Sequence, residues 1–328
     1  MKAITYTTYG SPDVLQLTEI EKPTPRENDL LIKVHATGLN AADWRMMRAD
    51  PFFVRFIAGL RKPKNQVLGV DIAGRVEAVG TGVTRFKVGD AVYADLSGIG
   101  FGGLAEYACV PEEIVALKPR NLTFEQAAAV PMAAVTALQG LRDIGRIQTG
   151  DKVLINGASG GVGTFAVQIA KSFGATVTAV CSTSKMAQAR SVGADHVIDY
   201  TQEDFANNGQ QYDLILAVNG NRALADYLQA LTPTGRYVVV GGAMSQVFAA
   251  ILLGPFKSKK GGKTIKDFTA KVSSADLATI TTLLEAEKVV PIIDRRYPLN
   301  ETPDAIRYLE QGHAKGKVII TITRETKI

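Results

Sequence analysis

The sequence predicts an α/β fold in two parts: a β-rich domain, followed by a doubly wound domain built on a parallel sheet. Three observations lead to this prediction. The chain has 328 residues, which is enough for about two domains. Up to residue 122 it shows short strand patterns with glycine turns, and beyond that point apolar strands alternate with helical segments. A glycine-rich loop lies between the first strand and the first long helix of the second part.

The first third of the chain carries strand patterns at 30–34 and 67–79, with glycine turns around them. Lys87–Tyr93 has a Gly-Asp turn ahead of another strand, and Gly102–Tyr107 enters one more. The pattern changes at Thr123, because Thr123 and Gln126 have the spacing of a helix capping box. We therefore predict a first domain of residues 1–122 that is completed by 273–328, and a second domain of 123–272.

The second part alternates apolar strands with helices. Strands are expected at 152–156, 176–180, 197–198, 214–217 and 236–240, and helices at 162–173, 186–192 and 222–231. This order predicts a parallel sheet with helices on both faces. The tail repeats the scheme with a helix at 274–287, a strand at 289–293, a helix at 302–311 and a strand at 317–322. Such a tail is expected to fold back onto the first domain.

Composition excludes several classes of function. The net charge of +5 is spread over both domains without a basic tail, which argues against a nucleic-acid partner. Cys109 and Cys181 are too far apart for a four-cysteine zinc lobe, and they favour a reducing, cytoplasmic setting. The sequence shows neither a signal-peptide pattern nor a run of about 18 apolar residues, so stable membrane insertion is not expected.

The strongest motif is the loop Gly157–Gly163, which follows the strand 153–155 and opens a helix. Gly157 allows a tight turn there, and Gly163 lets the helix pack closely on the strand. Backbone N–H groups at the start of such a helix bind a pyrophosphate. The predicted cofactor-binding residues of the loop are Ser159, Gly160, Gly161, Val162 and Gly163.

The segment beyond the loop favours NADPH over NADH. Chains that bind NAD usually place an acid about 20 residues further on, to hold the ribose 2′-hydroxyl. Residues 157–194 contain no Asp or Glu, and the second strand instead ends in Cys181–Lys185. Ser182 and Lys185 offer a hydroxyl and a positive charge for a 2′-phosphate. The alternative for Lys185 is a solvated lysine at a helix start.

Four segments carry a family resemblance: Gly38–Trp44, Leu68–Gly74, Ala129–Ala137 and Asn156–Gly163. With them the chain resembles the medium-chain dehydrogenase/reductase superfamily over nearly its whole length, and most of all the zinc-free quinone oxidoreductase and enone reductase branch. It is similar to plant chloroplast enone reductases, which have Asp-Trp-Lys where this chain has Asp43–Arg45. The resemblance implies a GroES-like catalytic domain and a Rossmann domain.

The resemblance also implies further cofactor contacts. Thr136 is implied on the cofactor side of the cleft and Asn40 as a further contact, whereas Lys185 and Tyr200 are implied at the 2′-phosphate. Gly241, Gly242 and Ala243 are implied beside the nicotinamide. Tyr200 has the alternative of a half-buried core tyrosine. Asn219 is expected to contact the cofactor because it follows a parallel strand, whose carboxyl end is where such sheets bind ligands.

The zinc ligands of the metal-dependent relatives are missing from this sequence. Those relatives have a cysteine where Asn40 stands, Gly-His-Glu where this chain has Gly69–Asp71, and another cysteine near Met132. The histidines show no ligand spacing and are expected at the surface or at strand ends; they are His35, His196 and His313. We therefore predict no catalytic metal.

Chemistry without a metal favours conjugate reduction. Oxidation of an alcohol develops an alkoxide that a metal usually stabilises, whereas hydride addition to a quinone or an enone spreads the charge into a phenolate or enolate. We predict Arg45 as the donor to the carbonyl oxygen, with a solvated face shared with Arg48 and Arg55 as the alternative. Asn40 is expected to hydrogen-bond cofactor or substrate. Solvent or a side chain would protonate the α-carbon.

Two apolar segments remain open to more than one interpretation. Residues 51–60, with Phe52, Phe53 and Phe56, fit a lid over the substrate or a buried helix. Residues 247–256, followed by Lys257, Lys259 and Lys260, fit a cover over the active site or a surface contact with a membrane or partner. The substrate is predicted to be a small enone, quinone or carbonyl compound, and the chain a monomer or homodimer. A zinc-independent alcohol dehydrogenase or carbonyl reductase and a non-catalytic NADPH-binding sensor or scaffold are the alternative functions.

Overall fold

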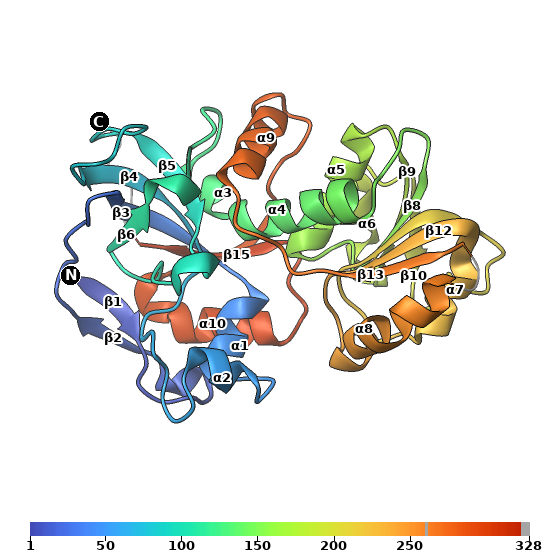
Figure 1. Ribbon diagram of the computed structural model, residues 1–328, viewed down its shortest axis with the longest axis horizontal. Coiled ribbons are helices and arrows are strands. Elements are labelled where there is room, and N and C mark those ends of the chain that lie inside the picture. The colour runs from blue at the N-terminus through green and yellow to red at the C-terminus, as the bar shows by residue number, and fades with distance from the viewer. Residues whose placement is uncertain (260–261, 323–328) are drawn as a thin grey trace. The chain divides into compact units, whose positions relative to one another are not determined.

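The computed structural model describes residues 1–259 and 262–322, and the chain divides into two compact units (Figure 1). Unit 1 contains residues 1–133, 272–286 and the chain from 291 onward. Unit 2 contains residues 134–271 and 287–290. The α/β class is confirmed, because a β-rich unit occurs together with a unit built on a parallel sheet.

Unit 1 is organised around a seven-stranded sheet in the order β14-β15-β3-β4-β5-β7, with β6 also paired to β3. The strands are β3 (Asp29–Leu39), β4 (Asp71–Val79), β5 (Ala91–Asp95), β6 (Tyr107–Pro111), β7 (Val115–Leu117), β14 (Ile293–Pro298) and β15 (Lys317–Thr321). Only β14 and β15 are paired in parallel. A separate antiparallel pair is formed by β1 (Lys2–Thr5) and β2 (Gln16–Glu19).

Five helices belong wholly to unit 1. They are α1 (Ala41–Arg48), α2 (Val54–Ala58), α3 (Phe124–Ala128), α9 (Ser274–Glu285) and α10 (Thr302–Glu310). Met47 of α1 is fully buried in a cluster with Leu39, Ile306 and Ile320. The N-terminal and C-terminal segments of the chain therefore share one apolar core around α1.

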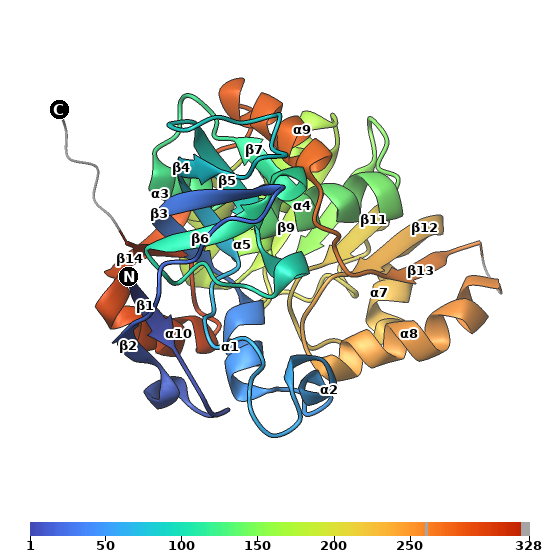
Figure 2. The same ribbon diagram turned by 60° about the vertical axis from the view of Figure 1, so that its left-hand side comes forward.

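Unit 2 has a six-stranded parallel sheet in the order β10-β9-β8-β11-β12-β13. The strands are β8 (Lys152–Asn156), β9 (Thr176–Cys181), β10 (His196–Asp199), β11 (Tyr212–Ala217), β12 (Leu231–Val239) and β13 (Thr264–Asp267). The helices are α5 (Gly161–Ser172), α6 (Met186–Ser191), α7 (Leu224–Ala230) and α8 (Met244–Lys259). Helix α8 packs against β13 and α7 (Figure 2).

The central strands of unit 2 are buried on both faces. Val153–Ile155 in β8 and Leu214–Ala217 in β11 have no exposed surface, although neighbouring residues of a strand point to opposite faces. Parallel sheets need this cover, which explains why these strands are continuous apolar runs rather than alternating ones. The expected parallel sheet is thus confirmed.

The boundary between the units differs from the expected 122–123 and lies at 133–134. The capping box at Thr123 is confirmed, since Thr123 Oγ accepts from Gln126 N and the Gln126 side chain accepts from Thr123 N. The helix it begins, α3, packs on β3 and β4 and therefore belongs to unit 1. Helix α4 (Pro131–Gln139) contains the boundary.

Two further expectations need correction. The strand expected at 289–293 begins only at Ile293, and Val289 and Val290 lie in unit 2 instead, where Gln168 binds the backbone of Val290 at 2.8 Å and 2.9 Å. His35 is buried within β3, where its ring stacks on Phe124 at 4.2 Å between centroids. Burial of His35 against the Phe124 ring, rather than exposure to solvent, explains why this histidine lies in an apolar strand.

Candidate active site

The phosphate loop joins β8 to α5, as the sequence predicts. Gly157 has φ +86°, a conformation that favours glycine. A Cβ on Gly163 would lie 2.1 Å from the carbonyl oxygen of Gly157, so the close packing of helix on strand requires glycine there. Gly160, in contrast, has only the Gly157 oxygen near it, at 3.9 Å. The loop is tight at its base and open at Gly160.

This loop fits a pyrophosphate. The described residues supply no acceptor for the backbone N–H groups of Gly161, Val162 and Gly163 in the first turn of α5. The open space next to Gly160 gives an anion room to approach them, and the helix dipole favours negative charge at that end. Ser159 is buried in the same turn.

The carboxyl ends of β9 and β10 bring together the residues predicted for the 2′-phosphate. Cys181 pairs with Asp199, so Ser182 and Tyr200 follow neighbouring strand ends, and Lys185 lies one turn beyond Ser182. Tyr200 is 64% exposed, which removes the alternative of a core tyrosine and leaves its ring accessible.

Asp199 is an acid at this edge that the sequence-based prediction did not consider. Its carboxylate accepts from the Thr183 hydroxyl and from Thr201, whose N and Oγ lie 3.0 Å and 2.8 Å away. The Thr183 bond, ahead of the others, lowers the pKa of Asp199. The carboxylate thus has its hydrogen-bond partners within the protein, and it links the segments that follow β9 and β10.

The ends of β11 and β12 carry Asn219 and Gly241–Ala243. A Cβ on Gly157 would lie 2.8 Å from the Asn219 Cβ, which places Asn219 directly beside the phosphate loop. Ala243 N donates to Gly220 O at 2.8 Å, so the loops after β11 and β12 also contact each other. The predicted residues of unit 2 other than Thr136 thus collect at one edge of the sheet.

A buried side-chain network supports these loops, and sequence patterns do not reveal it. Asn156 Nδ2 donates to the Tyr227 hydroxyl at 2.6 Å, and that hydroxyl donates to Gln246 Oε1 at 2.9 Å. Gln246 Nε2 then donates to Gly241 O at 3.1 Å. The network ties the end of β8 to α7, α8 and the loop after β12.

Thr136 lies on α4 and is buried. Its hydroxyl has no hydrogen-bond partner among the described residues. The hydroxyl is therefore available to a ligand.

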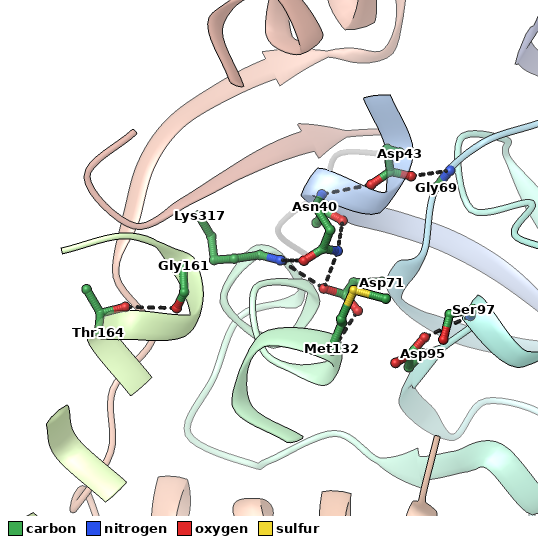
Figure 3. Close-up of polar contacts among 11 residues, drawn as sticks. Asn40, Asp43, Gly69, Asp71, Asp95, Ser97, Met132, Gly161, Thr164 and Lys317 are labelled. Atoms are coloured by element: carbon green, nitrogen blue, oxygen red, sulfur yellow. Dashed lines mark hydrogen bonds and ion pairs between the residues drawn. The ribbon is translucent and has the colours of Figure 1, made fainter. Parts of the chain in front are cut away.

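In unit 1 the residues at the expected zinc-ligand positions form an ionic network (Figure 3). Lys317 Nζ lies 2.9 Å from Asp71 Oδ2 and 2.6 Å from Asn40 Oδ1. Asn40 Nδ2 donates to Asp71 Oδ2 at 2.9 Å and to Gly38 O at 3.2 Å. Lys317 is 2% exposed and Asp71 is fully buried, so this is a desolvated ion pair.

The backbone around this network is fixed by carboxylates. Asp71 Oδ1 accepts from Met132 N at 2.8 Å in the first turn of α4. Asp43 accepts from Asn40 N at 2.7 Å and from Gly69 N at 2.9 Å. The first turn of α1 and the strand entry at Gly69 are therefore held by one side chain.

Two carboxyls near Asp71 have raised pKa values. Burial raises the pKa of Asp43 to about 7, against the lowering effect of its two backbone hydrogen bonds. Burial and the charge of Asp71 raise the pKa of Asp95 on β5 to about 6. Carboxyl groups with perturbed pKa values cluster at functional sites.

The predicted catalytic residues are placed differently from each other. Asn40 has both amide hydrogens and its oxygen engaged within unit 1, so its side chain holds Asp71 and Lys317 in place. Arg45 lies on α1 with its guanidinium 5.0 Å from the centroid of the Trp44 ring, partly exposed. Arg45 therefore remains the candidate donor to a substrate.

The described residues offer no group of three or more His, Cys, Asp or Glu side chains that would hold a metal ion. His196 and His313 are exposed, as expected, and far apart in sequence. At the position of the zinc ligands the ammonium of Lys317 lies among the oxygens. A divalent cation there would face a positive charge, so the donor set does not fit zinc.

The apolar segments after α1 and β12 are exposed in the structure. Phe52 and Phe56 are each 67% exposed, which rules out the buried-helix interpretation, and Phe256 in α8 is 75% exposed. Lys260, part of the predicted basic cluster, lies outside the described residues. In the described part of the chain no helix has the length and apolar character to cross a membrane.

Comparisons with known proteins agree with the two-unit architecture. Residues 26–120 match the family described as alcohol dehydrogenase GroES-like domain, and residues 192–320 match the family described as zinc-binding dehydrogenase. A tomato 2-methylene-furan-3-one reductase is 37% identical over 98% of this chain and 79% of its own length.

Two further matches extend this comparison. A chloroplastic NADPH-dependent alkenal/one oxidoreductase from Arabidopsis thaliana is 34% identical over 98% of this chain and 79% of its own. The solved structure of the quinone oxidoreductase from Coxiella burnetii is similar with a TM-score of 0.88, at 30% identity, and covers 98% of this chain and 99% of its own.

Proposed function

The chain belongs to the medium-chain dehydrogenase/reductase superfamily, and from this premise we propose that it is an NADPH-dependent reductase of α,β-unsaturated carbonyl compounds and quinones that works without zinc. The observation that carries the proposal is the Lys317 ammonium among the oxygens of Asn40 and Asp71. A site of this kind lacks the Lewis acid that an alcohol's developing alkoxide needs. It suffices for a reaction whose charge is delocalised over an enolate or phenolate.

The residues of unit 2 fit the cofactor. NADPH, when bound, supplies the hydride. The open first turn of α5 would hold its pyrophosphate, and Lys185, with Ser182 and Tyr200, would hold its 2′-phosphate. The relative named as an NADPH-dependent oxidoreductase supports the same preference.

The reaction adds a hydride to the β-carbon of the enone and a proton to the α-carbon. The electron pair of the C=C bond moves to the carbonyl oxygen, and Arg45 donates a hydrogen bond to the resulting enolate oxygen. The guanidinium is always charged, so this stabilisation needs no proton transfer. Asn40 acts as a positioning residue, since its amide hydrogens bind Asp71 Oδ2 and Gly38 O and its oxygen accepts from Lys317 Nζ.

Two properties outside the chemistry belong to the same proposal. The partner is a small molecule, and the protein is a monomer or homodimer. Both cysteines are free thiols, and their reduced state favours the cytoplasm as the compartment.

The test is NADPH consumption with a panel of small enones and quinones, with and without a metal chelator. Turnover of enones or quinones that the chelator leaves unchanged supports the proposal. Chelator-insensitive oxidation of plain alcohols without enone turnover would favour a zinc-independent alcohol dehydrogenase. Tight NADPH binding with no turnover of any substrate would favour a sensor or scaffold and contradict the proposal.

Cofactor choice has its own test in Lys185. We expect Lys185→Ala to raise the Kd for NADPH about tenfold or more and that for NADH less than twofold, since only NADPH carries the extra phosphate. Lys171→Ala is the control. It removes one positive charge, as Lys185→Ala does, but from a lysine that is paired with Asp195 at 2.8 Å. Equal losses for both cofactors would show that Lys185 contacts no phosphate.

A further inference from the structure

Unit 1 contains a small cavity that none of the predicted site residues lines. Its walls are mostly apolar, and its volume is about 20 Å³. The lining residues are Tyr6, Met46, Ala58, Asn65, Val67, Leu68 and Phe101. We call it the Tyr6 cavity. A space of this size accepts a single small group of the size of a water molecule or a hydroxyl.

Tyr6 is the polar group of the cavity that is most deeply buried. The residue is 3% exposed, and its hydroxyl has no hydrogen-bond partner among the described residues. Buried tyrosine hydroxyls normally have a partner, since an unpaired one costs free energy. Burial, followed by the charges of Tyr9 and Asp43, raises the pKa of Tyr6. The phenol therefore stays neutral and remains a donor.

The opposite wall is held in a strained conformation. Phe101 has φ +76°, between Gly100 at +97° and Gly102 at +117°. Hydrogen bonds fix this segment, from Phe101 N to Leu96 O at 3.1 Å and from Gly103 N to Gly69 O at 3.0 Å. A non-glycine residue with a positive φ is uncommon. Here it places a phenyl ring against the cavity.

Asn65 adds a second polar group to the wall. Its Nδ2 lies 2.2 Å from where a Cβ on Gly100 would be, so the glycine makes room for this amide. The Asn65 side chain has no hydrogen-bond partner among the described residues. Asn65 is exposed to solvent, so the buried Tyr6 hydroxyl is the polar group that the apolar lining encloses.

The cavity adjoins the elements that carry the proposed chemistry. Met46 follows Arg45 on α1, and Leu68 precedes Gly69, whose N–H is bound by Asp43. Tyr6 N donates to Gln66 O at 2.9 Å, which joins β1 to the segment before Val67. Helix α1 thus carries both the candidate donor Arg45, which is partly exposed, and Met46, which lines the Tyr6 cavity.

We propose that the Tyr6 cavity receives an oxygen substituent, such as a hydroxyl group, on the carbon next to the carbonyl of a small α,β-unsaturated ketone, and that the Tyr6 hydroxyl donates a hydrogen bond to the oxygen of that substituent. Tyr6 is then a specificity-determining residue, selecting hydroxylated or otherwise oxygen-substituted enones over apolar ones of equal size. This inference rests on the proposed function and adds a substrate class to it. It involves no chemical step beyond hydride and proton addition.

The experiment compares two isosteric substrates, 1-hydroxybut-3-en-2-one and pent-1-en-3-one, which differ by a hydroxyl in place of a methyl group. We expect Tyr6→Phe to lower kcat/KM for the hydroxyketone about tenfold relative to kcat/KM for pent-1-en-3-one, mainly by raising the KM for the hydroxyketone. Thermal unfolding and the Kd for NADPH show whether Tyr6→Phe alters the fold. An unchanged ratio overturns the inference.

Tyr308→Phe is the matched control. It removes the hydroxyl of another tyrosine of unit 1, which donates to Asp294 Oδ2 at 2.6 Å. We expect this variant to leave the ratio as in the wild type. If it lowers the ratio as Tyr6→Phe does, the effect is structural and the inference fails.

A second variant fills the cavity. Ala58→Leu places extra side-chain volume in it, and we expect both ketones to lose at least fivefold in kcat/KM relative to the shorter but-3-en-2-one. The same relative rates for all three ketones would show that substrate does not enter the cavity.

Failure of the proposed function is distinguishable from failure of this inference. If the wild type reduces none of these ketones, the proposed function is wrong for this class, and the cavity is tested by binding alone. Saturation-transfer NMR then compares 1-hydroxybutan-2-one with pentan-3-one on the wild type and on Tyr6→Phe. Preferential binding of the hydroxyketone that Tyr6→Phe removes supports the cavity, and equal binding overturns it.

Discussion

At the scale of single residues, the buried pair Lys317–Asp71 is the feature with the largest consequence for stability. Removing both charges from water is costly, and their attraction and their bonds to Asn40 and Met132 offset that cost. Breaking the pair leaves one charge buried without a partner. The pair is therefore expected to be strongly coupled, unlike an ion pair at the surface.

We expect Lys317→Met to lower the free energy of unfolding by about 3–5 kcal/mol, because Asp71 keeps its buried charge. Adding Asp71→Asn should recover about 2 kcal/mol of this loss, which a double-mutant cycle by urea unfolding measures. The control cycle uses Lys171–Asp195, whose side chains are 36% and 35% exposed, with an expected coupling below about 1 kcal/mol. Additive losses at Lys317 and Asp71 would contradict the pairing.

Asp95 gives the molecule a specific pH dependence. Burial, followed by the charge of Asp71, raises the pKa of Asp95 to about 6 in the folded protein, above the ordinary value of an aspartate. Below about pH 4 the carboxyl is protonated in both states, and between about pH 4 and 6 the unfolded chain ionises first. The unfolded state then binds fewer protons, so this group makes stability fall as pH rises through that window.

Asp95→Asn removes the titration and keeps an oxygen that can accept from Ser97 N, now 2.8 Å from the carboxylate. We expect the stability of the variant relative to the wild type to increase by about 2 kcal/mol between pH 4 and pH 7. Urea unfolding at four pH values measures the difference. Parallel curves for the two proteins would mean that Asp95 has an ordinary pKa.

At the scale of elements, the turn from β8 to α5 separates two roles of glycine. Gly163 is needed for packing, since a Cβ there meets the Gly157 oxygen at 2.1 Å. A Cβ on Gly160 would have no atom of the described residues, apart from its chain neighbours, closer than 3.9 Å, so a ligand has room to approach at that position.

We therefore expect Gly160→Ala to keep the melting temperature within about 2 °C and to raise the Kd for NADPH at least tenfold. Gly163→Ala should lower the melting temperature by more than about 4 °C, because the helix must move off the strand. Thermal unfolding and cofactor titration measure both quantities. Tight NADPH binding by Gly160→Ala would contradict the placement of the pyrophosphate.

The elements also show which predictions a sequence supports. The capping box at Thr123 and the phosphate loop are local patterns, because all of their residues lie within one turn or helix start. The ionic network is not local. Lys317 is a single polar residue at the start of an apolar strand, and it reaches Asp71 only because β15 and β4 both pair with β3. No pattern near residue 317 reports that pairing.

The same limit explains the errors. The lack of ligand spacing predicts His35 at the surface or at a strand end, whereas Phe124, on which its ring stacks, comes from a helix that begins 89 positions later. Val289 and Val290 look like a strand, yet Gln168 on α5 binds the Val290 backbone and replaces the ladder partner that a strand requires. Long-range contacts decide both cases.

At the scale of the whole molecule, the order of the chain makes unit 1 depend on both ends of the sequence. Strand β15 lies between β14 and β3, and its Val318 and Ile320 complete the apolar cluster that buries Met47. Unit 2, by contrast, has its own core from residues 154–265, in which Leu154, Ile215 and Tyr237 are fully buried.

A chain that ends after His313 lacks β15 and Lys317, so Asp71 loses its counter-charge and β3 loses a ladder partner. We expect unit 1 to unfold in this variant while unit 2 keeps its fold. Trp44 is the only tryptophan of the chain and packs on the apolar cluster of unit 1, so its emission reports on unit 1 alone. The emission maximum should shift to the red, as for a tryptophan in water, while a 2′,5′-ADP matrix still retains the protein through unit 2. Emission typical of a buried tryptophan would show that the N-terminal part of unit 1 folds without β15, and loss of both signals together would show that unit 2 needs unit 1 to fold.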